Sequence, residues 1–327
     1  MTLAKNKFWE VPSETQFNKI AISTFKYQYN NNLIYKSYCD LIKIDPNKIK
    51  TINEIPFLPI EFFKTKKVKS FKGKEYKIFY SSSTNKKNRS KHYIKSISNY
   101  IQSFRKCFNL FYGDIENYNL LALLPSYLER EDSSLIFMVH DLINLTRSSN
   151  SGFFINDYKN LYSKLDYLDR KNKKTILFGV SFALLDFIET KKINLKNTII
   201  METGGMKGRR KEIIRKELHE KLKKGFNVSK IHSEYGMTEL LSQAYSKGNG
   251  IFTCPPWMKV SIRKINDPLS NFINQESGPI NIIDLANYES CSFIATQDLG
   301  KIVSKNKFEV IGRIDESDTR GCNLMNF

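Results

Sequence analysis

Apolar residues in the first part of the chain recur at the spacing of a helix face. Phe17, Ala21 and Phe25 are each four positions apart, and a period of three to four residues is typical of one buried helix face. Two prolines follow at positions 56 and 59, and proline interrupts a regular helix. We therefore predict a helical N-terminal segment over residues 1–54.

Short apolar runs then alternate with helical patterns. The candidate strands cover residues 76–80, 119–124, 174–180 and 197–202. Alternating strands and helices predict an α/β layer with a largely parallel sheet, which we assign to residues 55–250. Ligands of such sheets bind beyond the carboxyl ends of the strands, so the residues after each run are candidates for a binding site.

The last part of the chain is strand-like. Candidate strands begin at Gly278, Ser292 and Phe308, and the second of them ends in Asp298. Residues 251–327 are therefore predicted to be a β-rich part that follows the helical segment and the α/β part.

A dense group of polar residues follows one of the apolar runs. The ring of Tyr235 can stack on a purine, and Gly236 allows a backbone to approach a ligand closely. The hydroxyl of Thr238 can bind a phosphate, and the carboxylate of Glu239 is a ligand that Mg²⁺ prefers. The apolar residues at 240–244 predict a helix after this group. The alternative is an ordinary strand-to-helix turn in which Thr238 is only the N-cap.

Two other stretches have residues suited to a nucleotide. Residues 81–90 form a hydroxyl- and cation-rich loop between a candidate strand and a candidate helix that begins at Ile94. That arrangement binds phosphate through N–H groups, hydroxyls and the helix dipole, and a flexible polar loop is the alternative. Gly204 and Gly205 would let a ligand lie against the backbone. The helix that follows them carries His219, which we expect at the surface.

The charge balance indicates an anionic partner. The chain has 327 residues, with 52 Lys and Arg against 33 Asp and Glu, and a formal net charge of +19. Such a balance invites a nucleic-acid hypothesis. The basic residues are dispersed, however, and no zinc-finger or aromatic RNA-binding signature accompanies them, so nucleic acid is an unfavoured partner. A positive field also attracts polyanionic substrates such as ATP.

The cysteines and the apolar runs indicate the cellular compartment in which we expect the protein. Five dispersed cysteines, without zinc spacing, are expected to be free thiols. No apolar run of about 20 residues is present, and the first residues lack the core of a signal peptide. We therefore expect a cytoplasmic protein without a membrane span.

Four motifs occur in order along the chain, together with Pro-Pro-Trp at positions 255–257. They are Ser81-Ser82-Ser83-Thr84, Glu234-Tyr235-Gly236-Met237-Thr238-Glu239, Thr296-Gln297-Asp298-Leu299-Gly300 and Gly312-Arg313-Ile314-Asp315. The series resembles the adenylate-forming acyl ligases and, more closely, the acyl-protein synthetases of the LuxE/PaaK group. The resemblance implies a large α/β domain with a mixed or parallel sheet and a β-rich C-terminal part.

The resemblance also implies a role for each motif. Tyr235 would stack on adenine, Thr238 would contact phosphate and Glu239 would hold Mg²⁺. Asp298 would bind the ribose hydroxyls, and Arg313 would lie near the ribose and the phosphates. The expected substrates are ATP and a fatty or related carboxylic acid, with Mg²⁺ as cofactor.

Two further contacts follow from the same resemblance. Gly204 and Gly205 would pass along the adenine, and the loop from Ser81 to Thr84 would take the phosphate-loop position. In the family this loop is usually rich in glycine, whereas here it has none. Larger relatives have a mobile C-terminal domain with a catalytic lysine after the Gly-Arg-x-Asp motif. We expect the fold to lack that domain, since the chain has 12 residues after Asp315.

Cys322 is the predicted acyl carrier. It lies five residues before the last one, Gly321 gives it freedom to move, and Arg320 would favour its thiolate. The resembling synthetases are acylated on a cysteine near the C-terminus that also follows a glycine. An acceptor protein, either a reductase, a carrier protein or a transferase, would then take the acyl group.

Three functions remain open from the residues alone. The leading one is an ATP-dependent acyl-protein synthetase that forms acyl-AMP and passes the acyl group to a cysteine thiol. The second is an acyltransferase without adenylation activity, as the glycine-free loop would suggest. The third is a basic module that binds nucleotide or nucleic acid.

Overall fold

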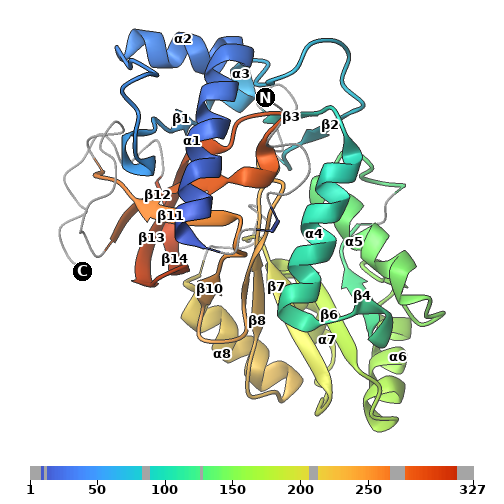
Figure 1. Ribbon diagram of the computed structural model, residues 1–327. Helices are drawn as coiled ribbons and strands as arrows, with labels where there is room; N and C mark the ends of the chain where they lie inside the picture. Colours follow the sequence, from blue (N-terminus) through green and yellow to red (C-terminus); the bar gives the residue numbers. More distant parts are fainter. Residues whose placement is uncertain are drawn as a thin grey trace. The chain divides into compact units, whose positions relative to one another are not determined.

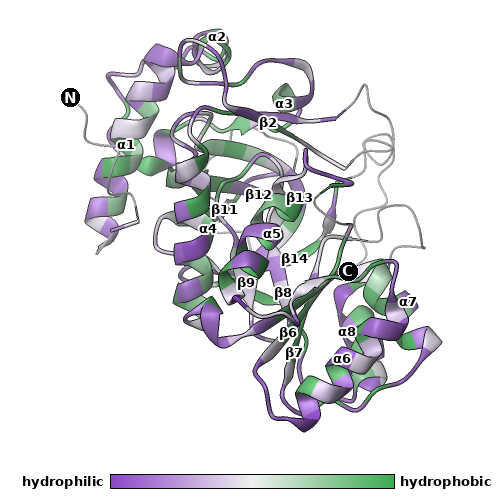
Figure 2. Cartoon of the chain, turned by 90° about the vertical axis from the view of Figure 1, so that its right-hand side faces the viewer, coloured by the Kyte–Doolittle hydropathy of each residue, from purple (hydrophilic) through white to green (hydrophobic). Residues whose placement is uncertain are grey.

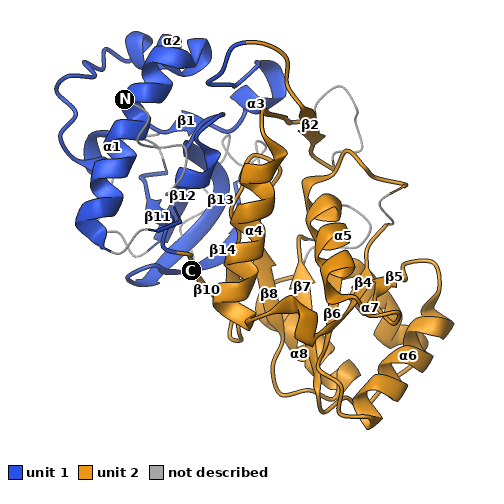
Figure 3. Cartoon of the chain, turned by 45° about the vertical axis from the view of Figure 1, so that its right-hand side comes forward, with its two compact units in different colours: residues 1–72, 256–327 blue, residues 73–255 orange. Residues whose placement is uncertain are grey.

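The computed structural model describes residues 9–10, 13–82, 89–125, 128–205, 213–265 and 277–314. The chain forms two compact units (Figure 3). We call residues 73–255 the parallel-sheet unit, and residues 1–72 with 256–327 the antiparallel-sheet unit. The N-terminal helices and the last strands thus belong to one unit. The expected division by order along the chain, at residues 54 and 250, stays a prediction.

The parallel-sheet unit is built on seven of the described strands. They are β4 (Asn119–Leu123), β5 (Gly152–Phe153), β6 (Thr175–Val180), β7 (Thr198–Thr203), β8 (His232–Tyr235), β9 (Ala244–Ser246) and β10 (Ile251–Thr253). Their order in the sheet is β10-β9-β8-β7-β6-β4-β5 (Figure 1). Strands β4, β5, β6, β7 and β8 pair parallel with one another, whereas β9 pairs antiparallel with both β8 and β10.

Helices cover both faces of this sheet. They are α4 (Ile97–Tyr112), α5 (Ser134–Thr146), α6 (Tyr158–Arg170), α7 (Ser181–Thr190) and α8 (Arg215–Phe226). Helices α4 and α5 lie on one face, and α6, α7 and α8 lie on the other (Figure 2). Ring contacts join the helices within each layer, such as the stacked rings of Phe187 and Phe226 at 5.9 Å. This double layer leaves the ends of the strands open for a site.

The apolar runs form the inner strands, as predicted. Every residue of β6 is buried, because helices cover both faces of a parallel sheet. Ser133 caps α5 by accepting a hydrogen bond from the backbone N–H of Ile136 at 3.4 Å. An α/β fold with a mixed sheet is therefore confirmed.

Two local predictions are wrong. Ile94 does not begin a helix, because residues Lys91–Ile94 form strand β3, which pairs antiparallel with β2 (Lys77–Tyr80). The loop after Tyr80 thus joins two strands, and helix α4 begins only at Ile97. No helix follows Glu239 either, since residues Ala244–Ser246 form strand β9 beside β8. Thr238 is therefore not the N-cap of a helix.

The antiparallel-sheet unit consists of N-terminal helices and C-terminal strands. Its elements are α1 (Glu14–Asn31), α2 (Leu33–Leu41), β1 (Leu58–Pro59), α3 (Phe62–Thr65), β11 (Met258–Ile262), β12 (Ser277–Asp284), β13 (Phe293–Ser304) and β14 (Lys307–Arg313). Strands β11 to β14 pair antiparallel in sequence order, and β1 pairs parallel with β13. The predicted helical face is confirmed in α1, where Phe17, Ala21 and Phe25 are buried.

Buried polar side chains tie α1 to the turn before β13. The side-chain amide of Gln28 donates to the carbonyl oxygens of Asn287 and Tyr288, and its oxygen accepts from the N–H of Ser292. These bonds pair backbone groups that burial removes from water. They explain why an N-terminal helix and C-terminal strands form one unit.

Among the described residues, no helix combines the length and the apolar character that crossing a bilayer requires.

Candidate active site

The carboxyl ends of β7 and β8 lie side by side in the parallel-sheet unit (Figure 1). Thr203 is the register partner of Glu234, so the glycines after β7 come next to Tyr235. Gly204 has a φ of +66°, a backbone conformation that favours glycine, and it is exposed, as is Gly205. The structure thus offers exposed glycine backbone beside the end of β8.

Tyr235 and Gly236 form the end of β8. The ring of Tyr235 is 8% exposed, and its centroid lies 5.7 Å from that of Phe252. A Cβ atom on Gly236 would collide with the carboxylate of Glu234, which accepts a hydrogen bond from the hydroxyl of Thr203. A side chain at position 236 would therefore displace the carboxylate of Glu234, independently of any ligand.

Thr238 and Glu239 lie in the connection between β8 and β9. The carbonyl oxygen of Thr238 is 2.7 Å from Nδ1 of His92, a fully buried residue of β3. This contact joins the β2–β3 hairpin to the connection. Glu239 is 5% exposed and Thr238 is half-buried. His92 was missed in the sequence because an isolated histidine in a polar stretch gives no signal.

Ser81 fixes the base of the loop that follows β2. Its Oγ accepts from the N–H of Ser90 at 2.9 Å, and its carbonyl oxygen accepts from Nε of Arg89 at 2.6 Å. Arg89 also forms an ion pair with Asp132 at 2.5 Å. Burial raises the pKa of Asp132, but hydrogen bonds from two arginines outweigh it and lower that pKa. Ser82 is exposed.

Some predicted residues lie beyond what the structure describes. Ser83 and Thr84 belong to residues 83–88, and Cys322 belongs to residues 315–327, neither of which is described. Their assignments stay predictions.

Asp298 and Arg313 face each other in the antiparallel-sheet unit. They are register partners on β13 and β14, and Nε of Arg313 lies 3.9 Å from Oδ1 of Asp298. The Asp298 side chain is 20% exposed and the Arg313 side chain 64%. The two residues that the resemblance assigns to ribose therefore occur as one cross-strand pair.

A charged residue inside strand β7 was missed in the sequence. Glu202 is 2% exposed and contacts His219 and Arg215 of α8 at 3.4 Å each. His219 is buried rather than at the surface, because it faces this carboxylate from the inner side of its helix. A carboxylate at the end of an apolar run, directly before Thr-Gly-Gly, was the signal that could have identified it.

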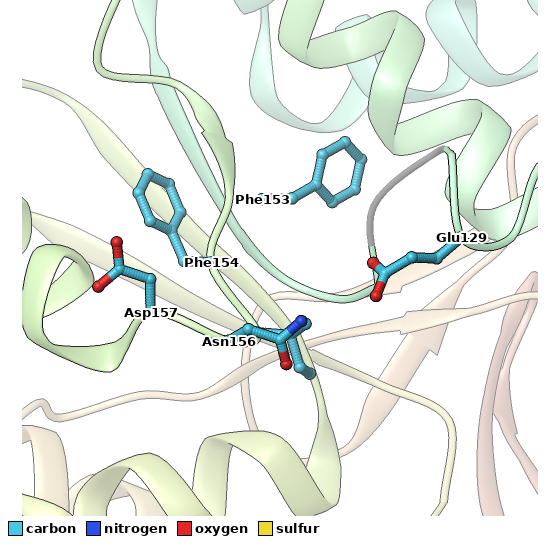
Figure 4. Close-up of a pocket in the computed structure, with 6 residues that line it drawn as sticks. Glu129, Phe153, Phe154, Asn156 and Asp157 are labelled. Atoms are coloured by element: carbon cyan, nitrogen blue, oxygen red, sulfur yellow. The ribbon is translucent and has the colours of Figure 1, made fainter.

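The described residues also form a small cavity beside β5. Its volume is about 270 Å³, and Glu129, Phe153, Phe154, Ile155, Asn156 and Asp157 line it (Figure 4). Asp157 already caps α6 by accepting from the N–H of Asn160. None of the predicted site residues lines this cavity.

A cation at Glu239 would need further oxygen ligands from a phosphorylated substrate. No group of three or more His, Cys, Asp or Glu side chains in the described part of the chain is arranged to hold a metal. Mg²⁺ usually binds through one or two carboxylates together with substrate phosphates and water. Glu239 can therefore serve as its protein ligand only with a phosphorylated substrate.

Solved structures with a similar fold are adenylate-forming ligases. A 2-hydroxyisobutyryl-CoA ligase in complex with 2-HIB-AMP superposes with a TM-score of 0.66 at 10% identity, covering 92% of this chain and 68% of that one. O-succinylbenzoate coenzyme A synthetase of Bacillus subtilis, in complex with ATP and magnesium, gives 0.51 at 18% identity, covering 72% and 49%. The fold is thus that of the adenylate-forming ligases.

The sequence comparisons agree with this class. The chain matches the family "Acyl-protein synthetase, LuxE" over residues 8–326, and it belongs to that family. It is 22% identical over 356 residues to the long-chain-fatty-acid–luciferin-component ligase of Aliivibrio fischeri. The alignment covers 98% of this chain and 91% of that one. The expected resemblance is confirmed, and the protein is an acyl-adenylate-forming ligase.

Proposed function

We propose that this protein activates a fatty or related carboxylic acid with ATP and transfers the acyl group to a cysteine thiol. The proposal is supported mainly by the residues that meet at one edge of the parallel sheet. There, exposed Gly204 and Gly205 follow β7 beside Tyr235, and Thr238 and Glu239 follow β8. An exposed glycine backbone, an aromatic ring, a hydroxyl and a carboxylate suit a base and its phosphates.

The first step is adenylation. A carboxylate oxygen of the acid attacks the α-phosphorus of ATP, an acyl–O–P bond forms, and the bond to the β-phosphate oxygen breaks to release pyrophosphate. The reaction mainly requires positioning and charge neutralisation. Tyr235 and the glycines hold adenine, and Thr238 contacts the phosphates. Glu239 holds Mg²⁺, which neutralises phosphate charge when it is bound.

The nucleotide sugar is bound by the cross-strand pair. The carboxylate of Asp298 accepts hydrogen bonds from both ribose hydroxyls, and Arg313 contributes positive charge near the ribose and phosphates. Their separation of 3.9 Å supports joint use, because both side chains can then reach the same ribose. Ser81, Ser82, Ser83 and Thr84 form the phosphate loop, whose base Ser81 anchors.

The second step transfers the acyl group to Cys322. The thiolate attacks the acyl carbonyl carbon, a thioester forms, and AMP leaves with the electron pair of the broken bond. Cys39, Cys107, Cys254 and Cys291 are buried. Burial raises the pKa of Cys291 to about 12, which disfavours the reactive thiolate. Cys322 is the remaining cysteine of the sequence.

A fatty acid is the proposed substrate because the named relative from Aliivibrio fischeri is a long-chain-fatty-acid ligase. The acyl-enzyme then needs an acceptor protein, for which a reductase, a carrier protein and a transferase are the proposed classes.

Acid-dependent exchange of pyrophosphate into ATP tests the first step. We expect exchange with the full chain and a long-chain acid, together with an acyl-enzyme that hydroxylamine cleaves. Cys322→Ser should keep the exchange and lose the acyl-enzyme. Mass spectrometry that finds the acyl group on a buried cysteine would contradict the assignment of Cys322. Acyl transfer from a thioester donor without any exchange would instead support the acyltransferase alternative.

A further inference from the structure

The carboxylate of Glu202 is the centre of a buried polar network below the candidate nucleotide site. Oε1 lies 3.4 Å from Nε2 of His219 and 3.4 Å from Nε of Arg215. Oε2 lies 3.2 Å from Oγ of Ser181, the first residue of α7. His219 also contacts Ser233 of β8 at 3.3 Å. The network thus joins two strands and two helices of the parallel-sheet unit.

One branch of the network reaches the glycine backbone after β7. Oγ of Ser181 lies 2.7 Å from the carbonyl oxygen of Gly204, so its hydroxyl proton faces two acceptors, Gly204 and Glu202. Gly204 is exposed and has a φ of +66°. Glycine in this conformation has wide backbone freedom, and the hydroxyl of Ser181 restricts it.

A second branch reaches the ring at the end of β8. The guanidinium of Arg215 lies over the ring of Phe252, with 4.9 Å between its central carbon and the ring centroid. The ring of Phe252 in turn packs on the ring of Tyr235 at 5.7 Å. Glu202 is therefore linked to both sides of the proposed adenine position. Ser181 lies between Glu202 and Gly204, and Arg215 and Phe252 lie between Glu202 and Tyr235.

The network keeps a charge inside the parallel-sheet unit. Burial raises the pKa of Glu202, but the hydrogen bond from His219 and the charge of Arg215 outweigh it, so that the pKa lies below the ordinary value of 4.5. An ionised carboxylate costs desolvation inside a strand whose other buried members include Ile200 and Met201. Such local conflict between a residue and its setting is typical of functional sites.

We propose that Glu202 is a positioning residue for the nucleotide base, which holds Tyr235 through Arg215 and Phe252 and shares the hydroxyl proton of Ser181 with the carbonyl oxygen of Gly204. The proposal rests on the proposed function, because it takes adenine to lie between the glycines and Tyr235. Glu202 touches neither the acid nor the phosphates in this scheme. Its loss should weaken ATP binding and leave the chemical step nearly unchanged.

Glu202→Gln is the decisive variant. A carboxylate offers two acceptor oxygens to the donors around it, whereas glutamine offers one oxygen and an N–H₂ group that opposes a donor. At least one branch therefore loses its partner. We expect the Kd of ATP, measured by calorimetry on the full chain, to rise about tenfold, within the range known for indirect effects. The KM for the acid and kcat of adenylation should change less than threefold.

Asp169→Asn is the matched control. Asp169 is also a buried carboxylate of this unit, and it accepts from the N–H groups of Lys196 and Asn197 and from the hydroxyl of Thr198. These partners lie just before β7 or at its first residue, at the other end of the strand from Gly204. The control should lower thermal stability at least as much as Glu202→Gln and leave the Kd of ATP unchanged.

Ser181→Ala separates the two branches. It removes only the hydroxyl that restricts Gly204, so we expect a smaller rise in the Kd of ATP, about threefold within the same range of indirect effects. The double variant Glu202→Gln, Ser181→Ala should have a higher Kd for ATP than either single variant, since Glu202 acts through Arg215 whereas Ser181 acts on Gly204.

Three results would overturn the proposal. The first is an equal Kd of ATP for wild type and Glu202→Gln at equal occupancy of the folded state. The second is an equal rise of the Kd in Asp169→Asn. The third is a fall of kcat in Glu202→Gln at constant Kd. Wild-type protein that binds ATP without catalysing exchange would refute the proposed adenylation and leave this inference standing. Wild-type protein that binds no ATP would refute both.

Discussion

The two groups of candidate residues are assembled by different kinds of β-sheet. In the parallel-sheet unit, neighbouring strands β7 and β8 end at the same edge, so the segments after Thr203 and Tyr235 meet there. In the antiparallel-sheet unit, Asp298 and Arg313 meet as register partners within adjacent strands. The sheet edge brings two connecting segments together, whereas the cross-strand pair brings two side chains together.

This difference has a chemical consequence. A sheet edge presents backbone groups, glycines and turn residues, which suit the flat base and the phosphates of a nucleotide. A cross-strand pair presents two side chains at a defined distance, here a carboxylate and a guanidinium at 3.9 Å. We therefore expect changes at the β8–β9 connection to affect the reaction, and changes at the cross-strand pair to affect nucleotide binding.

Glu239→Gln should have the largest effect. It removes the negative charge in the β8–β9 connection that we propose to bind Mg²⁺. Losing one such electrostatic contribution typically costs about 10²–10³-fold in rate. Pyrophosphate exchange should fall by that factor while the circular dichroism spectrum stays unchanged. Glu220→Gln on the exposed side of α8 is the control. Exchange at the wild-type rate in Glu239→Gln would refute its role.

Asp298→Ala should weaken ATP binding more than acid binding. Charge-assisted hydrogen bonds are worth roughly 1.5–3 kcal/mol, which corresponds to about 10- to 100-fold in Kd. Calorimetry with ATP measures the change, and the KM for the acid should stay constant. Asp40→Ala is the control, since Asp40 forms an exposed ion pair with Lys36 at 2.7 Å in the same unit. An unchanged Kd with lowered stability would mean that Asp298 only stabilises the pairing of β13 with β14.

Gly236→Ala tests whether the end of β8 tolerates a side chain. The new Cβ would meet the carboxylate of Glu234, which must move from its place beside Thr203 and Tyr235. We expect exchange to fall about tenfold, which corresponds to a shift of roughly 1.4 kcal/mol. Gly152→Ala in β5 is the control, because a Cβ there meets only ordinary contacts. A full rate in Gly236→Ala would show that this position is not critical.

His232 at the start of β8 should give the smallest effect, and only in acid. Burial, with the charges of Lys247 and Lys230, lowers its pKa from 6.5 to about 4. The unfolded chain therefore binds a proton that the folded chain does not, and stability is lost as pH falls from 6.5 towards 4. His232→Gln should flatten the dependence of the midpoint of urea unfolding on pH in this window. An unchanged pH dependence in the variant would contradict this assignment.

The buried strands were predictable because their signal is local. The runs that became β4, β6 and β7 are mostly apolar and mostly buried, as is typical of parallel strands covered on both faces. Glycines and polar residues after these runs then indicated the site, since parallel strands end at one edge.

The elements around Glu239 were not predictable in the same way. Leu240, Leu241 and Ala244 suit a helix face as well as a turn and a strand, because short apolar runs do not distinguish the two periods. Pairing of Ala244 with Tyr235 decides for the strand. Ile94 is a similar case, because its strand forms by pairing with Lys77 in the β2–β3 hairpin.

The sequence by itself determined the class of fold, the family motifs and which residue types could bind a nucleotide, because these depend on local composition and order. Only the tertiary structure decided that Asp298 faces Arg313, that His92 contacts Thr238 and that Glu202 lies below Gly204. The physical reason is that these relations depend on strand register and helix packing between segments distant in the chain. Such contacts leave no periodic pattern in the residues that make them.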